Sequence, residues 1–236
     1  MFSAIAERYD LLNTLLSFGI DRRWRAQAAR STTEHTPERV LDVATGTGEL
    51  AIAIKRRAPG ARVVGVDFAE AMLEVARRKA RRRGLEVCFC KADGMALPFA
   101  DDAFDAVTIA YGLRNFADRL IGLREFYRVL APGGRLVILE FPPPPAGVFG
   151  ILFRCYFLHV LPRVGAWLSG SGGAYSYLPA SVLEFPRPLD LAGMLQRAGF
   201  ARVRYKLQTF GVSALHVADK PKAAAPGAKR QQGVKA

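Results

Sequence analysis

Short apolar runs alternate with longer amphipathic segments along most of the chain. Each run predicts a strand, and the runs in the first part of the chain are 40–42, 62–67, 86–90, 104–109 and 135–140. The segments between them favour helices, such as Arg119–Val129, which ends where the Pro-Gly-Gly sequence of Ala131–Gly134 turns the chain. Alternating strands and helices are typical of parallel βαβ units. We therefore expect one α/β domain, for which 236 residues provide a full core.

The turn after the first run carries two glycines, in the sequence VLDVATGTGELA of Val40–Ala51. A run that ends on Asp42 and passes through Gly46 and Gly48 into a helix-forming segment predicts a strand, a tight turn and a helix start, with backbone amides exposed to a ligand. The next run ends on Asp67. Because parallel strands bring such carboxylates into one crevice, these residues predict a site for a ribose-containing cofactor.

The acidic residues at this turn discriminate between two cofactor classes. The glycines also fit the relaxed dinucleotide fingerprint. A pyrophosphate would meet the carboxylates of Asp42 and Glu49, which is unfavourable in a partly desolvated site. S-adenosylmethionine (SAM) instead carries a sulfonium and an ammonium, and its ribose diol suits Asp67 as a hydrogen-bond acceptor. We therefore expect SAM as the cofactor.

A third acidic residue, Asp93, follows the third run, so another strand delivers a carboxylate to the same edge. With these acids and glycines in order, the chain resembles class I SAM-dependent methyltransferases. The resemblance implies that Asp93 accepts from the adenine amino group. It also implies a Rossmann-like α/β fold, with a seven-stranded mixed sheet, mostly parallel with one antiparallel strand, and helices on both faces. A last helix, Leu189–Ala198, and two final strands, Val203–Leu207 and Val212–Val217, fit that arrangement.

The sheet does not need residues 142–186, which we expect to form an insertion. Its apolar stretch is too short for a membrane span and is interrupted by Arg154, His159 and Pro162. Two interpretations of this stretch fit the pattern: a buried core helix, or an apolar lid that covers a hydrophobic substrate.

Three regions follow from these assignments. We expect a helical N-terminal cap over residues 1–36, a methyltransferase domain over residues 37–219, and a disordered basic tail over residues 220–236. The net charge is +13, and much of the excess lies in the tail and in Arg77–Arg83. Basic residues in a last helical turn favour the macrodipole without any partner. An anionic membrane surface is the second interpretation, and nucleic acid is not expected.

Cysteine usage and the N-terminus bear on the compartment. Cys88 and Cys90 alternate on one predicted strand, and no Cys/His cluster has metal-ligand spacing, so no metal site is expected. Buried thiols in a reducing compartment account for the cysteines. No signal peptide is visible, so we expect a cytoplasmic protein, with peripheral attachment to the inner face of the cell membrane left open.

A narrower resemblance depends on motifs outside the cofactor turn. From Phe2 to about Lys220 the chain resembles the ubiquinone/menaquinone biosynthesis C-methyltransferases, of the demethylmenaquinone methyltransferase type. The matching segments are Tyr9–Trp24, Tyr111–Asn115, Arg124–Leu130, Pro132–Phe141, Tyr175–Ser181 and Ala214–His216. Departures are Leu12 for Met, Asp21 for His, Glu49 for Asp, Pro142 for Ser and Ala110 for a cofactor-contacting Ser, and Phe185–Leu189 lacks the usual Pro-Asp-Gln. A paralogue that methylates another aromatic compound is therefore an alternative.

The resemblance also implies site residues. Tyr9, Tyr111, His159 and Tyr177 are the candidates for substrate contact, and Arg114 and Asn115 are the candidates for catalysis. The predicted cofactor-binding residues are Asp42, Thr45, Gly46, Thr47, Gly48, Asp67, Phe68, Met72, Asp93, Gly94 and Ala110.

Methylation of a quinol carbon requires loss of the proton from the neighbouring hydroxyl, which titrates near about 10 in a phenol-like group. The Arg114 guanidinium stays protonated, so we expect it to stabilise the developing phenolate, although the family is also described with the matching Arg in proton removal through water. Asn115 would orient the hydroxyl or that water. A structural ion pair between Arg114 and Asp118 is the alternative.

The predicted function is SAM-dependent C-methylation of a prenylated quinol, either demethylmenaquinol or the matching ubiquinone precursor. The expected partner is therefore a lipid-soluble quinol, while a homodimer and contacts with other quinone-biosynthesis enzymes stay open. Methylation of another small aromatic, lipid or RNA substrate is one alternative. A non-catalytic SAM-binding module is the other.

Overall fold

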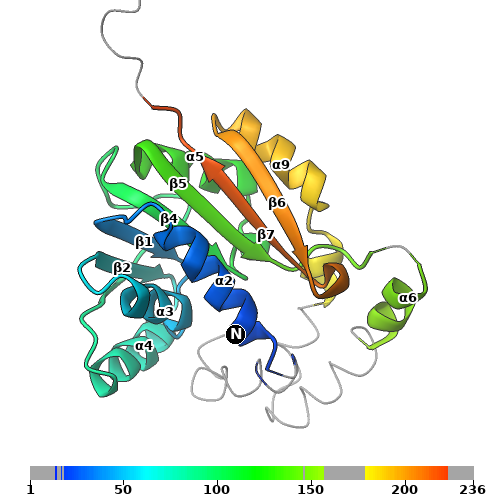
Figure 1. Ribbon diagram of the computed structural model, residues 1–236, viewed down its shortest axis with the longest axis horizontal. Helices are drawn as coiled ribbons and strands as arrows, with labels where there is room; N and C mark the ends of the chain where they lie inside the picture. Colours follow the sequence, from blue (N-terminus) through cyan, green and yellow to red (C-terminus); the bar gives the residue numbers. More distant parts are fainter. Residues whose placement is uncertain (1–13, 15–16, 18, 146, 157–178, 223–236) are drawn as a thin grey trace, which may run out of the picture.

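A seven-stranded sheet lies at the centre of the computed structural model (Figure 1), which describes residues 14, 17, 19–145, 147–156 and 179–222. The strand order is β3-β2-β1-β4-β5-β7-β6. The strands are β1 (Arg39–Val43), β2 (Arg62–Asp67), β3 (Cys88–Lys91), β4 (Phe104–Ala110), β5 (Leu130–Glu140), β6 (Ala201–Gln208) and β7 (Ser213–Asp219).

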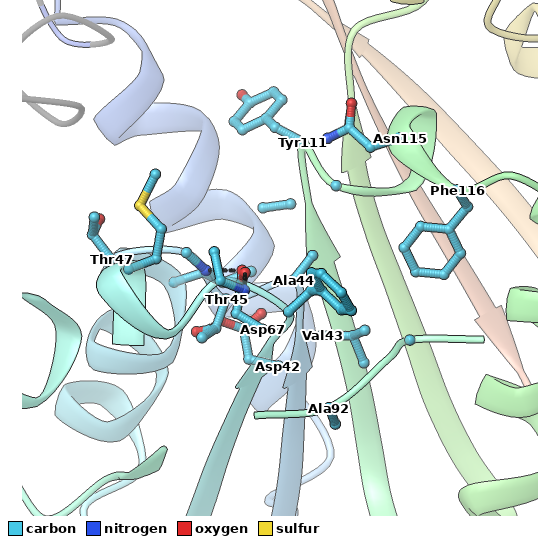
Figure 2. Close-up of a pocket in the computed structure, with 18 of the residues that line it drawn as sticks. Asp42, Val43, Ala44, Thr45, Thr47, Asp67, Ala92, Tyr111, Asn115 and Phe116 are labelled. Carbon is cyan, nitrogen blue, oxygen red and sulfur yellow. Dashed lines mark hydrogen bonds between the residues drawn. The ribbon is translucent and has the colours of Figure 1, made fainter. Parts of the chain in front are cut away.

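Strand direction confirms the predicted mixed sheet. Neighbouring strands from β3 to β5 pair in parallel, whereas β7 runs antiparallel to both β5 and β6. The chain order reverses between β1 and β4, so the connections after these strands lead away from each other. Figure 2 views this edge of the sheet, with Asp42 in β1 and Tyr111 just beyond β4. Ligands of open α/β sheets bind at such a switch point.

Helices cover both faces of the sheet, as predicted (Figure 1). Helices α2 (Asp21–Thr33), α3 (Glu49–Arg57) and α4 (Glu70–Arg82) share one apolar core with the sheet. Helices α5 (Arg119–Val129) and α9 (Pro188–Arg197) share the other. Helix α6 (Val148–Cys155) and the short 3-10 helices η2 (Leu113–Asn115) and η4 (Thr209–Gly211) complete the described elements. No helix in these described ranges is both long and apolar enough to cross a bilayer.

Two local expectations differ from the structure. Strand β5 begins at Leu130, directly after α5, so the Pro-Gly-Gly segment lies within the strand, where its pairing with β4 shifts register. The expectation of buried thiols is wrong, because Cys88 and Cys155 are exposed and Cys90 is half-buried. On the edge strand β3 it is Phe89, between the two cysteines, that packs into the core.

Helix α2 is fastened to the far half of the sheet by side chains. The Trp24 Nε1 donates to Thr209 Oγ1 at 2.9 Å, and the Gln208 amide nitrogen donates to Gln27 Oε1 at 2.8 Å. The buried Arg135 guanidinium donates to Glu34 Oε2 at 2.9 Å. These three contacts therefore tie the length of α2 to β5, β6 and η4.

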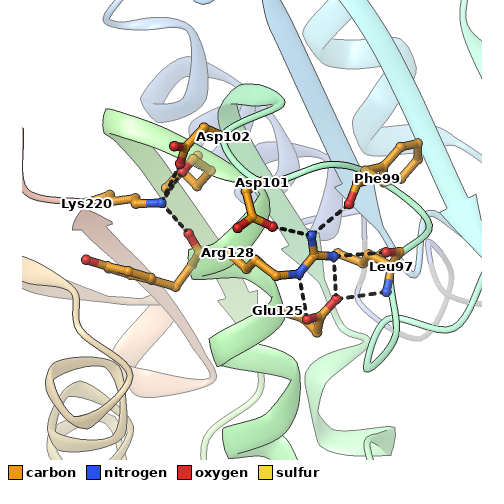
Figure 3. A network of polar contacts seen from close by, with 9 residues as sticks. Leu97, Phe99, Asp101, Asp102, Glu125, Arg128 and Lys220 are labelled. Atoms are coloured by element: carbon orange, nitrogen blue, oxygen red, sulfur yellow. Dashed lines mark hydrogen bonds and ion pairs between the residues drawn. The ribbon is translucent and has the colours of Figure 1, made fainter. Parts of the chain in front are cut away.

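The loop after β3 is held to α5 by the guanidinium of Arg128 (Figure 3). This group donates to the carbonyl oxygens of Leu97 and Phe99 at 3.0 and 2.7 Å and pairs with Glu125 and Asp101 at 2.9 and 2.8 Å. Glu125 also accepts from the Leu97 amide at 3.0 Å. Asp93 and Gly94 belong to this loop, so the network fixes part of the predicted cofactor site.

We expect Arg128→Met to lower the free energy of unfolding by about 1–3 kcal/mol, because two partly buried carbonyl oxygens lose their donor. Urea denaturation followed by circular dichroism measures the change. The matched control is Arg124→Met on the exposed side of the same helix, which should stay within about 0.5 kcal/mol of the parent protein. Equal effects of the two substitutions would contradict the role given to the network.

Candidate functional site

A cavity of about 430 Å³ opens at the ends of β1, β2 and β4, where the chain order reverses. Its size falls in the range typical of small-molecule sites, about 300–1,000 Å³. Figure 2 shows its walls, which come from the turn after β1, the end of β2, the loop after β3 and the segment from Ala110 to Phe116. The predicted residues that line it are Asp42, Thr45, Gly46, Thr47, Asp67, Phe68, Met72, Asp93, Gly94, Ala110, Tyr111 and Asn115.

Gly48 is the one predicted cofactor-binding residue that does not line the cavity. Its φ is +81°, and a Cβ atom there would lie 3.0 Å from Ala76 Cβ and from the ring of Phe89. Glycine is therefore required for the left-handed backbone and for close packing of the turn against α4 and β3. Gly48 therefore determines the conformation of the turn from the side that faces away from the cavity.

The backbone amides of the turn are largely used by the protein itself. The Gly46 amide donates to Asp67 Oδ2 at 2.8 Å, the Thr45 amide donates to Val66 O at 2.9 Å, and the Gly48 amide donates to Thr45 O at 2.9 Å. The expectation of amides exposed to a ligand is therefore wrong at these three positions.

Asp42 is a buried carboxylate beneath the turn. It is 1% exposed and accepts hydrogen bonds from Thr45 Oγ1 at 2.6 Å and from Thr108 Oγ1 at 2.8 Å. Burial raises the pKa of Asp42 to about 6, and the nearby Asp67 adds to the rise, although the hydrogen bonds oppose it. The group is ionised near pH 7 and lies within reach of a cationic ligand.

Asp67 is the last residue of β2 and Asp93 follows the end of β3, as predicted. Each oxygen of Asp67 accepts a backbone hydrogen bond, from Gly46 and from Ala69, and burial raises the pKa of this carboxyl despite them. The exposed Asp93 accepts from the Met95 amide at 2.9 Å. Carboxylate oxygens have two lone pairs each, so both residues keep acceptor capacity toward the cavity.

Glu49 lines the cavity at the start of α3 and is neutralised from α4. Its Oε1 atom lies 2.7 Å from Lys79 Nζ and 3.5 Å from Arg83 Nη1. Burial alone would raise the pKa of Glu49, but the hydrogen bond from Lys79 and the charges of Lys79, Arg83 and Arg25 lower it below its usual range.

The wall beyond β4 is an aromatic turn. Tyr111 has a φ of +58° and its ring stacks on Phe141 with centroids 4.4 Å apart. Burial raises the pKa of Tyr111 well above its usual value. A Cβ atom on Gly112 would lie 2.5 Å from Ala44 Cβ, so the turns after β1 and β4 touch only because this residue is glycine. Tyr111 and Asn115 both line the cavity (Figure 2).

Arg114 lies behind this wall and is not among the residues that line the cavity. Its side chain is 5% exposed, and its Nη1 atom lies 2.8 Å from Oε1 of Glu140, which is buried. The same nitrogen donates to the Tyr111 carbonyl oxygen. The predicted alternative pair with Asp118 is wrong, because the Asp118 carboxylate caps α5 by accepting from Leu120 and Ile121. Catalysis by Arg114 stays a prediction.

Three predicted substrate contacts, Tyr9, His159 and Tyr177, lie outside the described residues, as do most of the tail and the middle of the insertion. Within the residues described, no group of three His, Cys, Asp or Glu side chains could hold a metal ion.

The sequence interpretation missed Arg25, which lines the cavity from α2. Its guanidinium carbon lies 5.4 Å from the centroid of the Tyr111 ring. Arg25 directly follows the Tyr9–Trp24 motif and lies one helical turn from Asp21, with which it pairs. No local pattern distinguishes it from the exposed Arg22 and Arg23 on the same helix, because only the packing of α2 brings it to the site.

Known proteins resemble the chain along most of its length. It is 63% identical over 221 residues to demethylmenaquinone methyltransferase of Thermus thermophilus, covering 94% of this chain and 100% of that protein. It is 57% identical over 220 residues to the enzyme of the same name from Deinococcus radiodurans, covering 93% and 91% of the two chains. The ubiquinone/menaquinone biosynthesis C-methyltransferase UbiE of Geobacter sulfurreducens is 48% identical over 227 residues, with 93% and 87% covered.

Solved structures support the fold. A putative O-methyltransferase from Nostoc punctiforme superposes with a TM-score of 0.67 at 21% identity, covering 93% of this chain and 60% of that one. A SAM-dependent methyltransferase from Thermotoga maritima, a possible histamine N-methyltransferase, gives 0.64 at 18% identity, covering 93% and 97%.

The family assignment agrees with the cavity at the switch point of the sheet. The ubiE/COQ5 methyltransferase family matches residues 1–220, which include every element that lines the cavity. The chain therefore belongs to the ubiE/COQ5 methyltransferase family and is a SAM-dependent methyltransferase.

Proposed function

We propose that this protein transfers the methyl group of SAM to a ring carbon of demethylmenaquinol. The observation that carries the proposal is the 63% identity to a demethylmenaquinone methyltransferase that the chain covers from end to end. The acidic cavity supports it, because Asp42, Asp67 and Asp93 suit a cofactor with sulfonium and ammonium charges.

The described residues fit SAM in a definite direction. We place the ribose diol at Asp67 and the adenine amino group at Asp93, because both carboxylates keep acceptor capacity at neighbouring strand ends. The ammonium group then lies on the side of ionised Asp42. When bound, SAM supplies the methyl group and the thioether leaving group.

The acceptor then enters from the side of Tyr111 and Asn115. The exposed Asn115 side chain can orient the quinol hydroxyl, or a water beside it, for loss of its proton. Alignment of the ring carbon with the methyl group is the main contribution of the protein, because the reaction is an in-line displacement.

Arg114 acts on this wall through its buried contacts. Its guanidinium joins the Glu140 carboxylate to the Tyr111 carbonyl oxygen, so it ties the start of the Tyr111–Asn115 turn to the end of β5. We therefore propose that Arg114 is a positioning residue, and that its pair with Glu140 determines where its charge lies relative to the phenolate.

We also propose peripheral docking on an anionic membrane, where a prenylated acceptor resides. The net charge of +13 supports this proposal, as do the exposed side chains of Ile151 and Phe210, which are 69% and 81% accessible. A Cβ atom on Gly211 would lie 3.5 Å from Pro145, so η4 contacts the segment that leads to α6. The two apolar side chains therefore belong to neighbouring parts of the surface.

The direct test supplies purified full-length protein with SAM labelled in its methyl group and with reduced demethylmenaquinol in lipid vesicles. We expect a product heavier by one methyl group, formed faster in anionic than in zwitterionic vesicles at low salt. Mass spectrometry of the quinone fraction identifies the product. Refusal of every prenylated quinol, with transfer to a soluble phenol, would contradict the acceptor proposal, and equal rates in both vesicle types would contradict the docking proposal alone.

We expect Glu140→Gln and Arg114→Lys to lower kcat by about 100-fold while SAM affinity changes little, because each loosens the wall that aligns the acceptor. Isothermal titration with SAM shows that the variants are folded, and single-turnover assays measure the chemical step. A direct role of Arg114 alone predicts a different result, in which only Arg114→Lys is impaired.

Asp42→Asn should stabilise the ligand-free protein at pH 8 and weaken SAM binding. Raising the pKa of Asp42 from 3.8 to about 6 means that its ionisation costs roughly 3 kcal/mol of folding free energy above pH 6. The Asn amide oxygen can accept from one threonine hydroxyl and its amide nitrogen can donate to the other, so two hydrogen bonds survive.

The sign of this effect gives a pH signature. The stability gain of Asp42→Asn should be largest above pH 6 and shrink as the pH falls from 6 toward 3.8, where the native Asp42 becomes protonated in the folded protein. Urea denaturation across that range measures it, with Glu74→Gln on the surface of α4 as the control. A gain that does not depend on pH would rule out the burial of charge as its cause.

A further inference from the structure

The cavity leaves one group of SAM without an evident partner. Its wall carries the carboxylates of Asp42, Glu49, Asp67 and Asp93, which suit the sulfonium and the ammonium. The methionine end of SAM also carries a carboxylate, which these residues repel.

Backbone amides cannot bind this carboxylate at three positions of the turn. The amides of Thr45, Gly46 and Gly48 all donate within the protein, to Val66, Asp67 and Thr45. A helix N-terminus is the usual partner of an anion. Here Glu49 occupies the first position of α3, and Gly48 precedes it without a side-chain cap. These three amides are therefore occupied, and a cationic side chain is the natural partner for the anionic end of the cofactor.

Arg25 is the one Lys or Arg among the described residues that line the cavity. It lies over the face of Tyr111, with its guanidinium carbon 5.4 Å from the ring centroid. Its charge also lowers the pKa values of Glu49 and Tyr111, so it acts on both the α3 side and the β4 side of the cavity.

The Arg25 guanidinium is held in place by a neighbouring residue of its own helix, Asp21. Asp21, which is 4% exposed, pairs with Arg25 one helical turn away and accepts a hydrogen bond from Ser17 Oγ at 2.9 Å. Trp24 fastens the same turn of α2 to Thr209. A guanidinium presents its N–H donors in a planar fork, whose geometry matches a carboxylate in a bidentate contact.

The direction of the cofactor brings its anionic end to this residue. The strand order β3-β2-β1-β4 places Asp93 and Asp67 on one side of the cavity and Tyr111 on the other. With adenosine at Asp93 and Asp67, the methionine part extends across the turn after β1 toward Tyr111 and α2. We propose that Arg25 binds the α-carboxylate of SAM, so that helix α2 contributes a cofactor contact to the site. This inference rests on the adenosine placement given above.

The test compares SAM with decarboxylated SAM, which keeps the adenosine, the sulfonium and the amino group but lacks the carboxylate. We expect Arg25→Met to weaken SAM binding by about 10- to 100-fold, the loss typical of a charged hydrogen-bonded pair. Binding of decarboxylated SAM should change less than about twofold. Arg25→Lys should recover part of the SAM affinity. Isothermal titration calorimetry on the full chain gives both dissociation constants without any methyl acceptor.

Two controls separate the possible outcomes. Arg22→Met, an exposed residue of the same helix, should leave both affinities unchanged. Asp67→Asn should weaken both ligands alike, and if it does not, the adenosine placement fails rather than the Arg25 assignment. Equal weakening of both ligands by Arg25→Met would show a merely structural role and overturn the proposal. Unchanged SAM affinity with a lower kcat would overturn it too, and would place the Arg25 charge on the acceptor oxygen.

Discussion

The hydrogen bond from the Gly46 amide to the Asp67 carboxylate is the contact on which the site depends. It ties the turn after β1 to the end of β2, so the position of the turn and the position of the ribose acceptor are determined together. This hydrogen bond also occupies the Gly46 amide, which in a phosphate-binding turn would donate to the phosphate. Similar glycine-containing turns can therefore serve different cofactors, because the fate of their amides depends on the next strand.

Charge balance accounts for much of the remaining architecture. Four carboxylates line one cavity, and they are tolerable because Glu49 is paired from α4 and Asp42 is hydrogen-bonded by two threonine hydroxyls. Burial, with a smaller contribution from the charge of Asp67, raises the pKa of Asp42, which is a cost to the ligand-free fold, while the ionised carboxylate attracts a cationic cofactor. Function and stability thus oppose each other at this residue.

The wall opposite the turn has a different construction. Tyr111 is held in a left-handed conformation, stacked on Phe141, and anchored through its carbonyl oxygen to the buried Arg114–Glu140 pair. Breaking such a pair leaves an uncompensated buried charge, whereas an intact pair can specify one arrangement of its neighbours. The shape of the acceptor side therefore depends on residues that do not touch the cavity.

The strand segments and the strand-end acids Asp42, Asp67 and Asp93 could be predicted from the sequence, and the resemblance to class I methyltransferases implied one antiparallel strand. The strand segments follow from local periodicity, and parallel strands necessarily bring their carboxyl ends to one edge. The motifs Tyr9–Trp24 and Tyr111–Asn115 likewise identified the family. Three features of the site were decided by the tertiary structure alone. Arg114 pairs with Glu140 instead of Asp118, Gly48 does not line the cavity, and Arg25 does. The physical reason is that spacing along the chain determines which residues share a strand end or a helix face. The partner of a charged side chain from a distant segment is decided by how the helices pack on the sheet.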